Sequence, residues 1–214
     1  MDSSVNWISA EAFSEEALCA TLRSESLFVG DGFLSHEEVD ALRAEIQALD
    51  QSGLLQPAAV GRAAGRFVDP QVRGDRTLWL PTPSAPMGSK VLERIEALRQ
   101  GLNREFFLGL WDFEGHYALY PPGGRYERHL DRFDSSQRRE VSLIVYLNPS
   151  DWSAEADGGG LRAFIPALSG EVEQERVVAP VGGRMVCFFS AEIPHEVLPA
   201  KRDRMSLTGW FRVR

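Results

Sequence analysis

A histidine and an aspartate stand two residues apart in the segment RHLDRFD, within a region that otherwise alternates like a β-strand. Successive side chains of an extended chain point to opposite faces, so His129 and Asp131 project the same way and can reach one common point. A metal ion is one such point. Two polar positions on a surface strand are the ordinary alternative for an isolated pair of this kind.

A second histidine, His195 in the segment EIPHEVLP, completes a candidate set of metal ligands. It lies far enough beyond His129 for several antiparallel strands to turn back and bring the two imidazoles together. Two histidines and one carboxylate on one side of a metal leave the opposite positions open, as in non-haem Fe(II) oxygenases. A zinc hydrolase can use the same three ligands, so this set alone does not identify the metal.

The last predicted strand, RMSLTGWFRVR, offers a binding site for an acidic small molecule. Its alternation places Arg204 with Ser206 and Thr208 on one face and apolar residues on the other. A planar guanidinium can hold a carboxylate through two hydrogen bonds, so this face suits a small dicarboxylate. Tyr146, in VSLIVYLNP, carries a hydroxyl that can complete the site. The alternatives are a solvent-facing strand and a half-buried tyrosine.

Two periodicities divide the chain into a helical part and a part rich in strands. Apolar residues recur at helical spacing over roughly 13–24, 35–50 and 89–109, and Ser35 with Glu38 predicts a capping box at the second of these helices. After the third helix the period changes to two, with PPGG, DGGG and VGGR as turn sequences. This order predicts an α+β fold with a β-sandwich or jelly roll. Strands are expected at 115–120, 125–131, 139–147, 161–165, 175–180, 184–189, 194–199 and 204–213.

The segment 51–76 is rich in glycine, proline and arginine. A long irregular segment in a compact domain is more often functional than decorative, so we expect a mobile loop that meets the substrate. The length of 214 residues fits one domain, 1–214. Within it, 1–112 would supply helical support and the loop, and 113–214 would supply the β core.

Composition narrows the classes of partner and compartment. The net charge of -8 argues against nucleic acid as a partner, because a groove that follows phosphates needs a basic surface. The start, MDSSVNWISAEAFSEE, lacks the basic and apolar segments of a signal peptide, and no stretch approaches the ~20 apolar residues of a membrane span. Cys19 and Cys187 lack the spacing of a metal site, and we expect Cys187 to be a buried apolar thiol. We expect a cytoplasmic protein with no membrane partner.

Five segments of the chain resemble the Fe(II)- and 2-oxoglutarate-dependent dioxygenases, specifically their prolyl 4-hydroxylase branch, which includes the oxygen-sensing prolyl hydroxylases. They are YPPGGRYERHLD, VYLNPSDW, GGGLRAF, FFSAEIPHEVLPA and RMSLTGWF, within about 117–213. A weaker match, VRGDRTLWL at 72–80, is similar to the base of the mobile substrate loop in that branch. The resemblance implies a double-stranded β-helix, a jelly-roll or cupin-like barrel, with amino-terminal helices packed on it.

The resemblance also implies a role for each matching position. His129, Asp131 and His195 would ligate Fe(II). Arg204 would pair with the distal carboxylate of 2-oxoglutarate, and O2 would be the other cosubstrate. The remaining implied residues are Tyr146 and Thr208 beside Arg204, Tyr120 and Trp210 lining the iron pocket, and Arg73, Asp75 and Arg139 closing over or holding a peptide substrate. For the last group, a turn ion pair or a solvated arginine at a strand start is the ordinary alternative.

The implied reaction is hydroxylation of a prolyl residue in a protein, with release of succinate and CO2 and with ascorbate in support. Bacterial members of the family point to a cytosolic protein partner, and elongation factor Tu is the candidate substrate. A hydroxylase of a free amino acid or small metabolite is the alternative within the superfamily; the long loop and its RGD favour a peptide. Outside the enzymes, a non-catalytic metal- or 2-oxoglutarate-binding sensor would keep the same residues.

Overall fold

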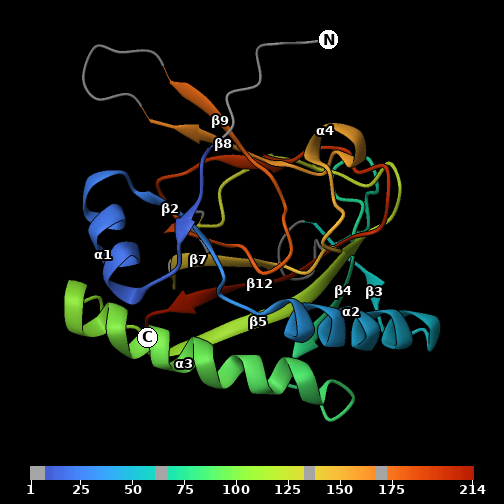
Figure 1. The fold of residues 1–214 in the computed structure, drawn as a ribbon, viewed down its shortest axis with the longest axis horizontal. Helices are drawn as coiled ribbons and strands as arrows, with labels where there is room; N and C mark the ends of the chain where they lie inside the picture. Colours follow the sequence, from blue (N-terminus) through green and yellow to red (C-terminus); the bar gives the residue numbers. More distant parts are fainter. Residues whose placement is uncertain (1–7, 61–66, 133–137, 167–172) are drawn as a thin grey trace.

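The computed structural model describes residues 8–60, 67–132, 138–166 and 173–214. Within them the chain forms an α+β fold of two β-sheets accompanied by four helices (Figure 1). No helix of these ranges is both long and apolar enough to cross a membrane. The helices are α1 (Glu15–Ser24), α2 (His36–Gln51), α3 (Pro86–Phe106) and α4 (Ala154–Asp157).

A large sheet and a small sheet contain all the named strands. The large sheet contains β1 (Glu11–Ala12), β2 (Leu27–Asp31), β3 (Gln56–Pro57), β4 (Arg76–Leu80), β5 (Asp112–Tyr120), β7 (Arg139–Tyr146), β10 (Met185–Phe189) and β12 (Arg204–Arg212). The small sheet contains β6 (Tyr126–His129), β8 (Leu161–Ile165), β9 (Gln174–Val178) and β11 (His195–Val197). Their spatial orders are β1-β2-β10-β7-β12-β5-β4-β3 and β6-β11-β8-β9. All neighbours run antiparallel except β1 and β2.

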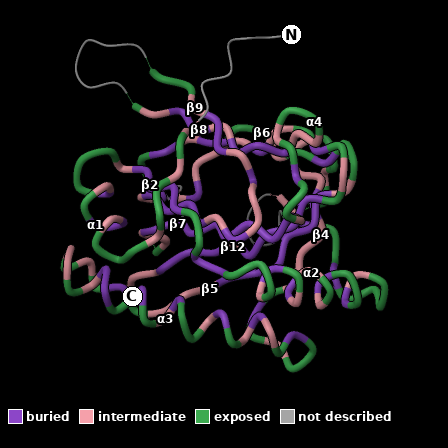
Figure 2. Tube along the Cα trace, in the orientation of Figure 1, coloured by how far each residue is buried: buried purple, intermediate pink, exposed green. Residues whose placement is uncertain are grey.

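Two hydrophobic cores lie on opposite faces of the large sheet. On one face, Leu42 of α2 and Ile95 of α3 share a core with Leu143 of β7. On the other face, Ile144 of β7 shares a second core with Leu161 of the small sheet. Figure 2 shows the buried positions concentrated along the strands, while the helices are exposed on their outer sides. The alternation of each central strand thus sends one set of side chains toward the helices and the other set between the sheets.

Glu45 fixes two helices to the strand β5. Its carboxylate accepts hydrogen bonds from the backbone nitrogens of Met87 (2.8 Å) and Gly88 (3.1 Å), which begin α3, and from the hydroxyl of Tyr117 (2.6 Å) on β5. A Cβ atom at Gly88 would lie 2.5 Å from that hydroxyl, so only glycine allows this close approach. A carboxylate at a helix start also complements the helix dipole. The helices therefore pack on one face of β5, and the other face of β5 borders the space between the sheets.

The α+β, double-stranded β-helix fold is confirmed, and the predicted helices and strands lie within a few residues of the observed ones. The first 112 residues are not only helical, however, because β1 to β4 extend both edges of the large sheet. In β2 the run Leu27, Phe28 and Val29 is buried on both faces, so it lacks the alternation that identifies a strand. Both cysteines are buried, as expected for Cys187.

The expected loop 51–76 contains more regular structure than predicted. Strand β3 lies within it, and Val60 pairs with Phe67 in an isolated antiparallel bridge. Residues 61–66 lie outside the described residues, and the mobility of the loop stays a prediction.

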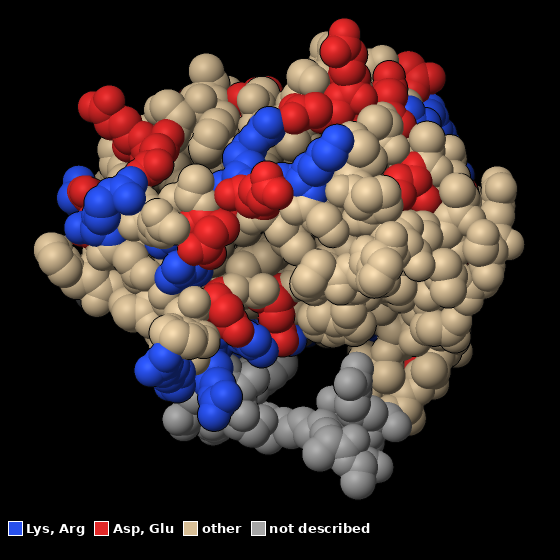
Figure 3. Space-filling model, turned by 90° about the horizontal axis from the view of Figure 1, so that it is seen from below, with Lys and Arg blue, Asp and Glu red and all other residues tan. Residues whose placement is uncertain are grey.

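Charged side chains of both signs lie next to one another on the face that Figure 3 shows. Basic side chains there alternate with acidic ones and do not form a separate patch.

Candidate active site

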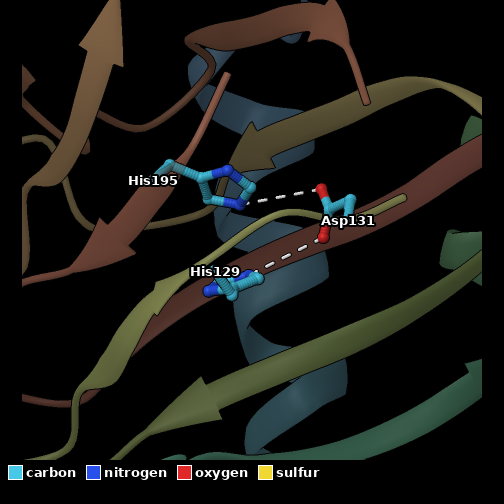
Figure 4. A group of neighbouring side chains, drawn as sticks. All are labelled: His129, Asp131 and His195. Carbon is cyan, nitrogen blue, oxygen red and sulfur yellow. Dashed lines mark ion pairs between the residues drawn. The ribbon is translucent and has the colours of Figure 1, made fainter. Parts of the chain in front are cut away.

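Three potential metal ligands meet between the sheets. His129 ends β6, His195 begins β11, and the two residues are direct partners in the pairing of these strands. Asp131 lies just beyond β6, with its carboxylate directed toward both imidazoles (Figure 4). Nε2 of His129 lies 3.7 Å from Oδ1 of Asp131, and Nε2 of His195 lies 3.6 Å from Oδ2. One ligand atom from each residue of this triad lies within 4.8 Å of the others, so the three can hold one metal ion.

Backbone carbonyls set the tautomers of both histidines. Nδ1 of His129 lies 2.8 Å from the carbonyl oxygen of Glu127, and Nδ1 of His195 lies 2.9 Å from that of Ile193. A carbonyl oxygen can only accept, so each Nδ1 carries the proton. The lone pair on each Nε2 is then directed to the metal point, the usual arrangement of a metal-binding histidine.

Burial and mutual contacts set the charges of the triad. Burial lowers the pKa of His195 to about 4, so this imidazole is neutral at neutral pH. Burial would raise the pKa of Asp131, but the neighbouring His195 and His129 hold it well below its usual range. A neutral His195 beside an ionised Asp131 is the combination of charges that metal ligation requires.

The triad opens into a cavity of about 70 Å³. Most of the residues expected at the site line this cavity, namely Tyr120, Arg204, Thr208, Trp210, Arg73 and Arg139 in addition to the triad. Of the remaining two, Asp75 pairs with Arg73, and Tyr146 packs beside Arg204 without lining the cavity. The structure therefore brings the whole predicted set to one place.

A buried positive charge lies at one end of the cavity. Arg204 is 1% exposed, and no acidic side chain of the described residues pairs with it. Its guanidinium carbon lies 5.0 Å from the ring centre of Tyr120 and 5.2 Å from that of Tyr146, and Nε donates to the carbonyl oxygen of Gly159 at 2.8 Å. A buried guanidinium without a counter-ion is costly, so this end of the cavity favours an anionic ligand.

Hydroxyl groups accompany this guanidinium. The hydroxyl of Tyr146 is buried and has no hydrogen-bond partner within the described ranges. The hydroxyl of Thr208 lies 3.1 Å from that of Ser206, on the same face of β12 as Arg204. A carboxylate beside Arg204 can satisfy such hydroxyls, so the residues fit a small dicarboxylate.

Two further arginines reach the cavity, each held by a carboxylate. Arg73 donates to both carboxylate oxygens of the buried Asp75, at 2.7 and 2.9 Å. Arg139 pairs with Glu114 at 2.7 Å and lies over the ring of Trp210, 3.4 Å from its centre. Paired in this way, the guanidiniums are fixed in orientation and contribute little net charge to the cavity.

His116 is a cavity residue that was not predicted. It is 1% exposed and packs beside both Trp79 and Trp210, with ring centres 4.7 and 5.6 Å away. Burial lowers its pKa to about 3, and its Nδ1 has no partner in the part of the chain that is described. The signal was present in the sequence: His116, Ala118 and Tyr120 alternate on one strand face, and Tyr120 was already assigned to the pocket.

Comparisons with known proteins agree with this geometry. The family model of the 2OG-Fe(II) oxygenase superfamily matches residues 115–212. A crystal structure of a Pseudomonas putida prolyl-4-hydroxylase is similar, with 43% sequence identity, a TM-score of 0.80, and coverage of 94% of this chain and 100% of that chain. A Trichoplax adhaerens prolyl hydroxylase in complex with a hypoxia inducible factor peptide fragment shares the fold, with 23% identity, a TM-score of 0.78, and coverage of 92% and 88%.

A curated relative covers almost the same part of this chain. Human Egl nine homolog 1 is 28% identical over 205 residues, which are 92% of this chain and 46% of the relative. The chain thus spans about half the length of the curated mammalian relatives it matches.

Proposed function

Because the chain belongs to the prolyl 4-hydroxylase branch of the 2OG-Fe(II) oxygenase superfamily, we propose that it hydroxylates a prolyl residue in a protein substrate. The reaction consumes 2-oxoglutarate and O2 and releases succinate and CO2. The observation that carries this proposal is that the triad and the buried guanidinium of Arg204 meet at one cavity. The first is suited to Fe(II) and the second to the distal carboxylate of 2-oxoglutarate.

The triad fits Fe(II) in its donor atoms. Two imidazole nitrogens and one carboxylate oxygen, from His129, His195 and Asp131, would hold Fe(II). Fe(II) bound there supplies the oxidising chemistry that a C–H bond requires. Burial keeps the imidazole of His195 neutral, and the two carbonyl contacts orient both rings.

In this proposal Arg204 binds the distal carboxylate of 2-oxoglutarate. Its bond to the carbonyl oxygen of Gly159 uses Nε and leaves further donors of the guanidinium for the carboxylate. The hydroxyls of Tyr146 and Thr208 complete the site. Tyr120 is buried and packs on the guanidinium.

The peptide would enter along the wall that contains Arg73, Arg139 and Trp210. The ion pairs of Arg73 with Asp75 and of Arg139 with Glu114 hold both guanidiniums in place before the substrate arrives. Such preorganised donors can bind backbone carbonyls of a peptide at a reduced entropic cost. His116 and Trp79 extend the same wall toward the surface, where Trp79 is 45% exposed.

Elongation factor Tu is the substrate that we propose to test first. This choice rests on the resemblance to bacterial members of the family, and the similar Pseudomonas putida protein is such a member. The protein, Fe(II), 2-oxoglutarate and ascorbate are incubated with purified elongation factor Tu in air. Succinate is quantified, and mass spectrometry of the tryptic peptides locates any added oxygen.

The outcomes separate the reaction from the substrate. Succinate formation that depends on elongation factor Tu, with one oxygen on a proline, supports both proposals. Succinate formation without such oxygen keeps the cosubstrate chemistry and removes elongation factor Tu. Stimulation by a free amino acid or a small metabolite instead would replace the protein substrate, and binding of 2-oxoglutarate without any turnover would leave a sensor.

A further inference from the structure

A buried pair of serines contacts the carboxylate of the triad. Ser142 lies on β7 and is 1% exposed, and its hydroxyl donates to Oδ2 of Asp131 at 2.7 Å. Ser190, which directly follows β10, is 0% exposed, and its hydroxyl oxygen lies 2.8 Å from that of Ser142. Neither serine lines the cavity. Any effect of the pair on the cavity must therefore pass through Asp131.

The direction of the two hydrogen bonds follows from their chemistry. A hydroxyl carries a single proton, and Ser142 gives its proton to the carboxylate, which accepts. The bond between the two serines must then run from Ser190 to Ser142. The result is an ordered chain from Ser190 through Ser142 to Asp131, in which each hydroxyl polarises the next.

Asp131 needs such support more than the two histidines do. His129 and His195 belong to paired strands, and each has a backbone carbonyl that fixes its ring. Asp131 lies beyond the end of β6, so no strand pairing fixes its backbone. Side-chain contacts from the large sheet take the place of that pairing.

Ser190 is itself tied to both neighbours of this arrangement. Its backbone nitrogen donates to the carbonyl oxygen of Glu140 on β7 at 3.0 Å, and its carbonyl oxygen accepts from the backbone nitrogen of Arg132 at 3.2 Å. Arg132 follows Asp131 directly, and its side chain pairs with Glu140 at 2.7 Å. Ser190 thus links the residue after Asp131 to the strand that carries Ser142.

We propose that Ser142, supported by Ser190, is a positioning residue that holds the carboxylate of Asp131 in its ligating orientation and so sets how tightly the triad retains a metal. The inference rests on the proposed function, since it assigns Asp131 as a ligand. Ser142 bonds to Oδ2, while Oδ1 faces Nε2 of His129, so the hydrogen bond fixes how both oxygens are presented to the two imidazoles. Groups that orient metal ligands commonly change metal affinity by roughly 10- to 100-fold when they are removed.

The test measures Mn(II) affinity in the absence of substrate. Mn(II) prefers the same nitrogen and oxygen ligands without oxidising, and free Mn(II) is quantified by electron paramagnetic resonance during a titration. We expect Ser142→Ala to bind Mn(II) roughly 10- to 100-fold more weakly than the wild type. Ser142→Thr, which keeps the hydroxyl, should restore most of the affinity, and Ser190→Ala should give a smaller loss than Ser142→Ala.

Val141→Ala is the matched control. Val141 precedes Ser142 on β7, is equally buried, and packs into the core on the helix side of the sheet. Its truncation should lower the melting temperature of the metal-free protein without changing the affinity for Mn(II). The double variant Ser142→Ala/Ser190→Ala should bind Mn(II) no more weakly than Ser142→Ala, because Ser190 acts through Ser142.

Wild-type affinity in Ser142→Ala, with only a lower melting temperature, would overturn the inference and leave the serines a packing role. If Ser142→Ala does not fold, the affinity of Ser190→Ala for Mn(II) tests the inference instead. Wild-type affinity in Ser190→Ala would contradict the proposed hydrogen-bond relay from Ser190 through Ser142 to Asp131. The readout is independent of substrate. Loss of Mn(II) affinity in a protein that hydroxylates no proline would keep this inference and remove the proposed function.

Discussion

At the scale of the residue, the buried guanidinium of Arg204 most strongly restricts what the cavity can bind. It has no acidic partner among the described side chains, and two tyrosine rings enclose it. The strand alternation of the sequence already placed this arginine beside hydroxyls on one face. The sequence could not show that Gly159, from a distant segment, would supply the carbonyl that fixes its Nε.

Substitution Arg204→Lys tests the role of the planar guanidinium. Lysine keeps the positive charge but cannot hold a carboxylate with two parallel hydrogen bonds. We expect the affinity for 2-oxoglutarate, measured by calorimetry with Mn(II) present, to fall about 10- to 100-fold, since a hydrogen bond to a charged group contributes about 1.5–3 kcal/mol. Arg202→Lys, at an arginine paired with Asp151 on the surface, is the control and should bind normally. Equal affinities in the two variants would contradict the role of Arg204.

At the scale of the element, the turn between α4 and β8 shapes the end of the cavity. Gly159 in this turn has a φ of +70°, a conformation that L side chains rarely adopt. A Cβ atom there would lie 3.0 Å from Cδ of Arg204, so the space that glycine leaves is occupied by the arginine. The sequence GGG predicts a turn, but the contact of that turn with β12 depends on the tertiary fold.

Two alanine substitutions separate the backbone effect from this contact. Gly109 also has a φ of +70°, but a Cβ atom there would meet nothing within 4 Å. Gly109→Ala should reduce the free energy of unfolding by about 1–2 kcal/mol and leave the affinity for 2-oxoglutarate unchanged. Gly159→Ala should destabilise more and also weaken 2-oxoglutarate binding several-fold. Denaturant unfolding and calorimetry measure both quantities; unchanged 2-oxoglutarate affinity in Gly159→Ala would refute the crowding argument.

Strands were predictable where one face is apolar and the other polar, as in β12. Strand β2 was missed because both of its faces are buried, and a short apolar run has no period. The arrangement of the helices could not be predicted from the sequence either. It depends on pairs such as Glu45 with Tyr117, which are distant in sequence and carry no local signal. His129 and Asp131 are recognisable from their strand spacing, whereas His116 is recognisable only together with Tyr120 on the same strand face.

At the scale of the whole molecule, burial of histidines makes stability depend on pH. The unfolded chain protonates an ordinary histidine near pH 6.5, but burial lowers the pKa of His116 to about 3 in the folded protein. The stability that a neutral His116 contributes is therefore complete above about pH 6.5 and is lost as the pH falls toward 3. His195, with a pKa lowered to about 4, acts in the same direction.

Substitution His116→Gln should reduce this acid sensitivity. Both proteins are measured with a chelator present to remove bound metal. Between pH 7 and pH 5, the free energy of unfolding of the wild type should fall by about 2 kcal/mol more than that of His116→Gln. Denaturant unfolding at each pH measures the difference. His36→Gln, at an exposed position in the first turn of α2, should keep the pH dependence of the wild type. A wild-type slope in His116→Gln would show that His116 is protonated as easily in the folded protein as in the unfolded chain.

The most direct measurement for the whole account is an unbiased search for hydroxylated proline. A bacterial protein extract is treated with the purified protein, Fe(II), ascorbate and 2-oxoglutarate, and its tryptic peptides are compared by mass spectrometry with an extract treated with His129→Ala. The account predicts one added oxygen on a proline of a dominant protein, absent from the extract treated with the variant. Added oxygen on another residue type, or on the same proline with both proteins, would contradict a prolyl hydroxylase that works through this triad.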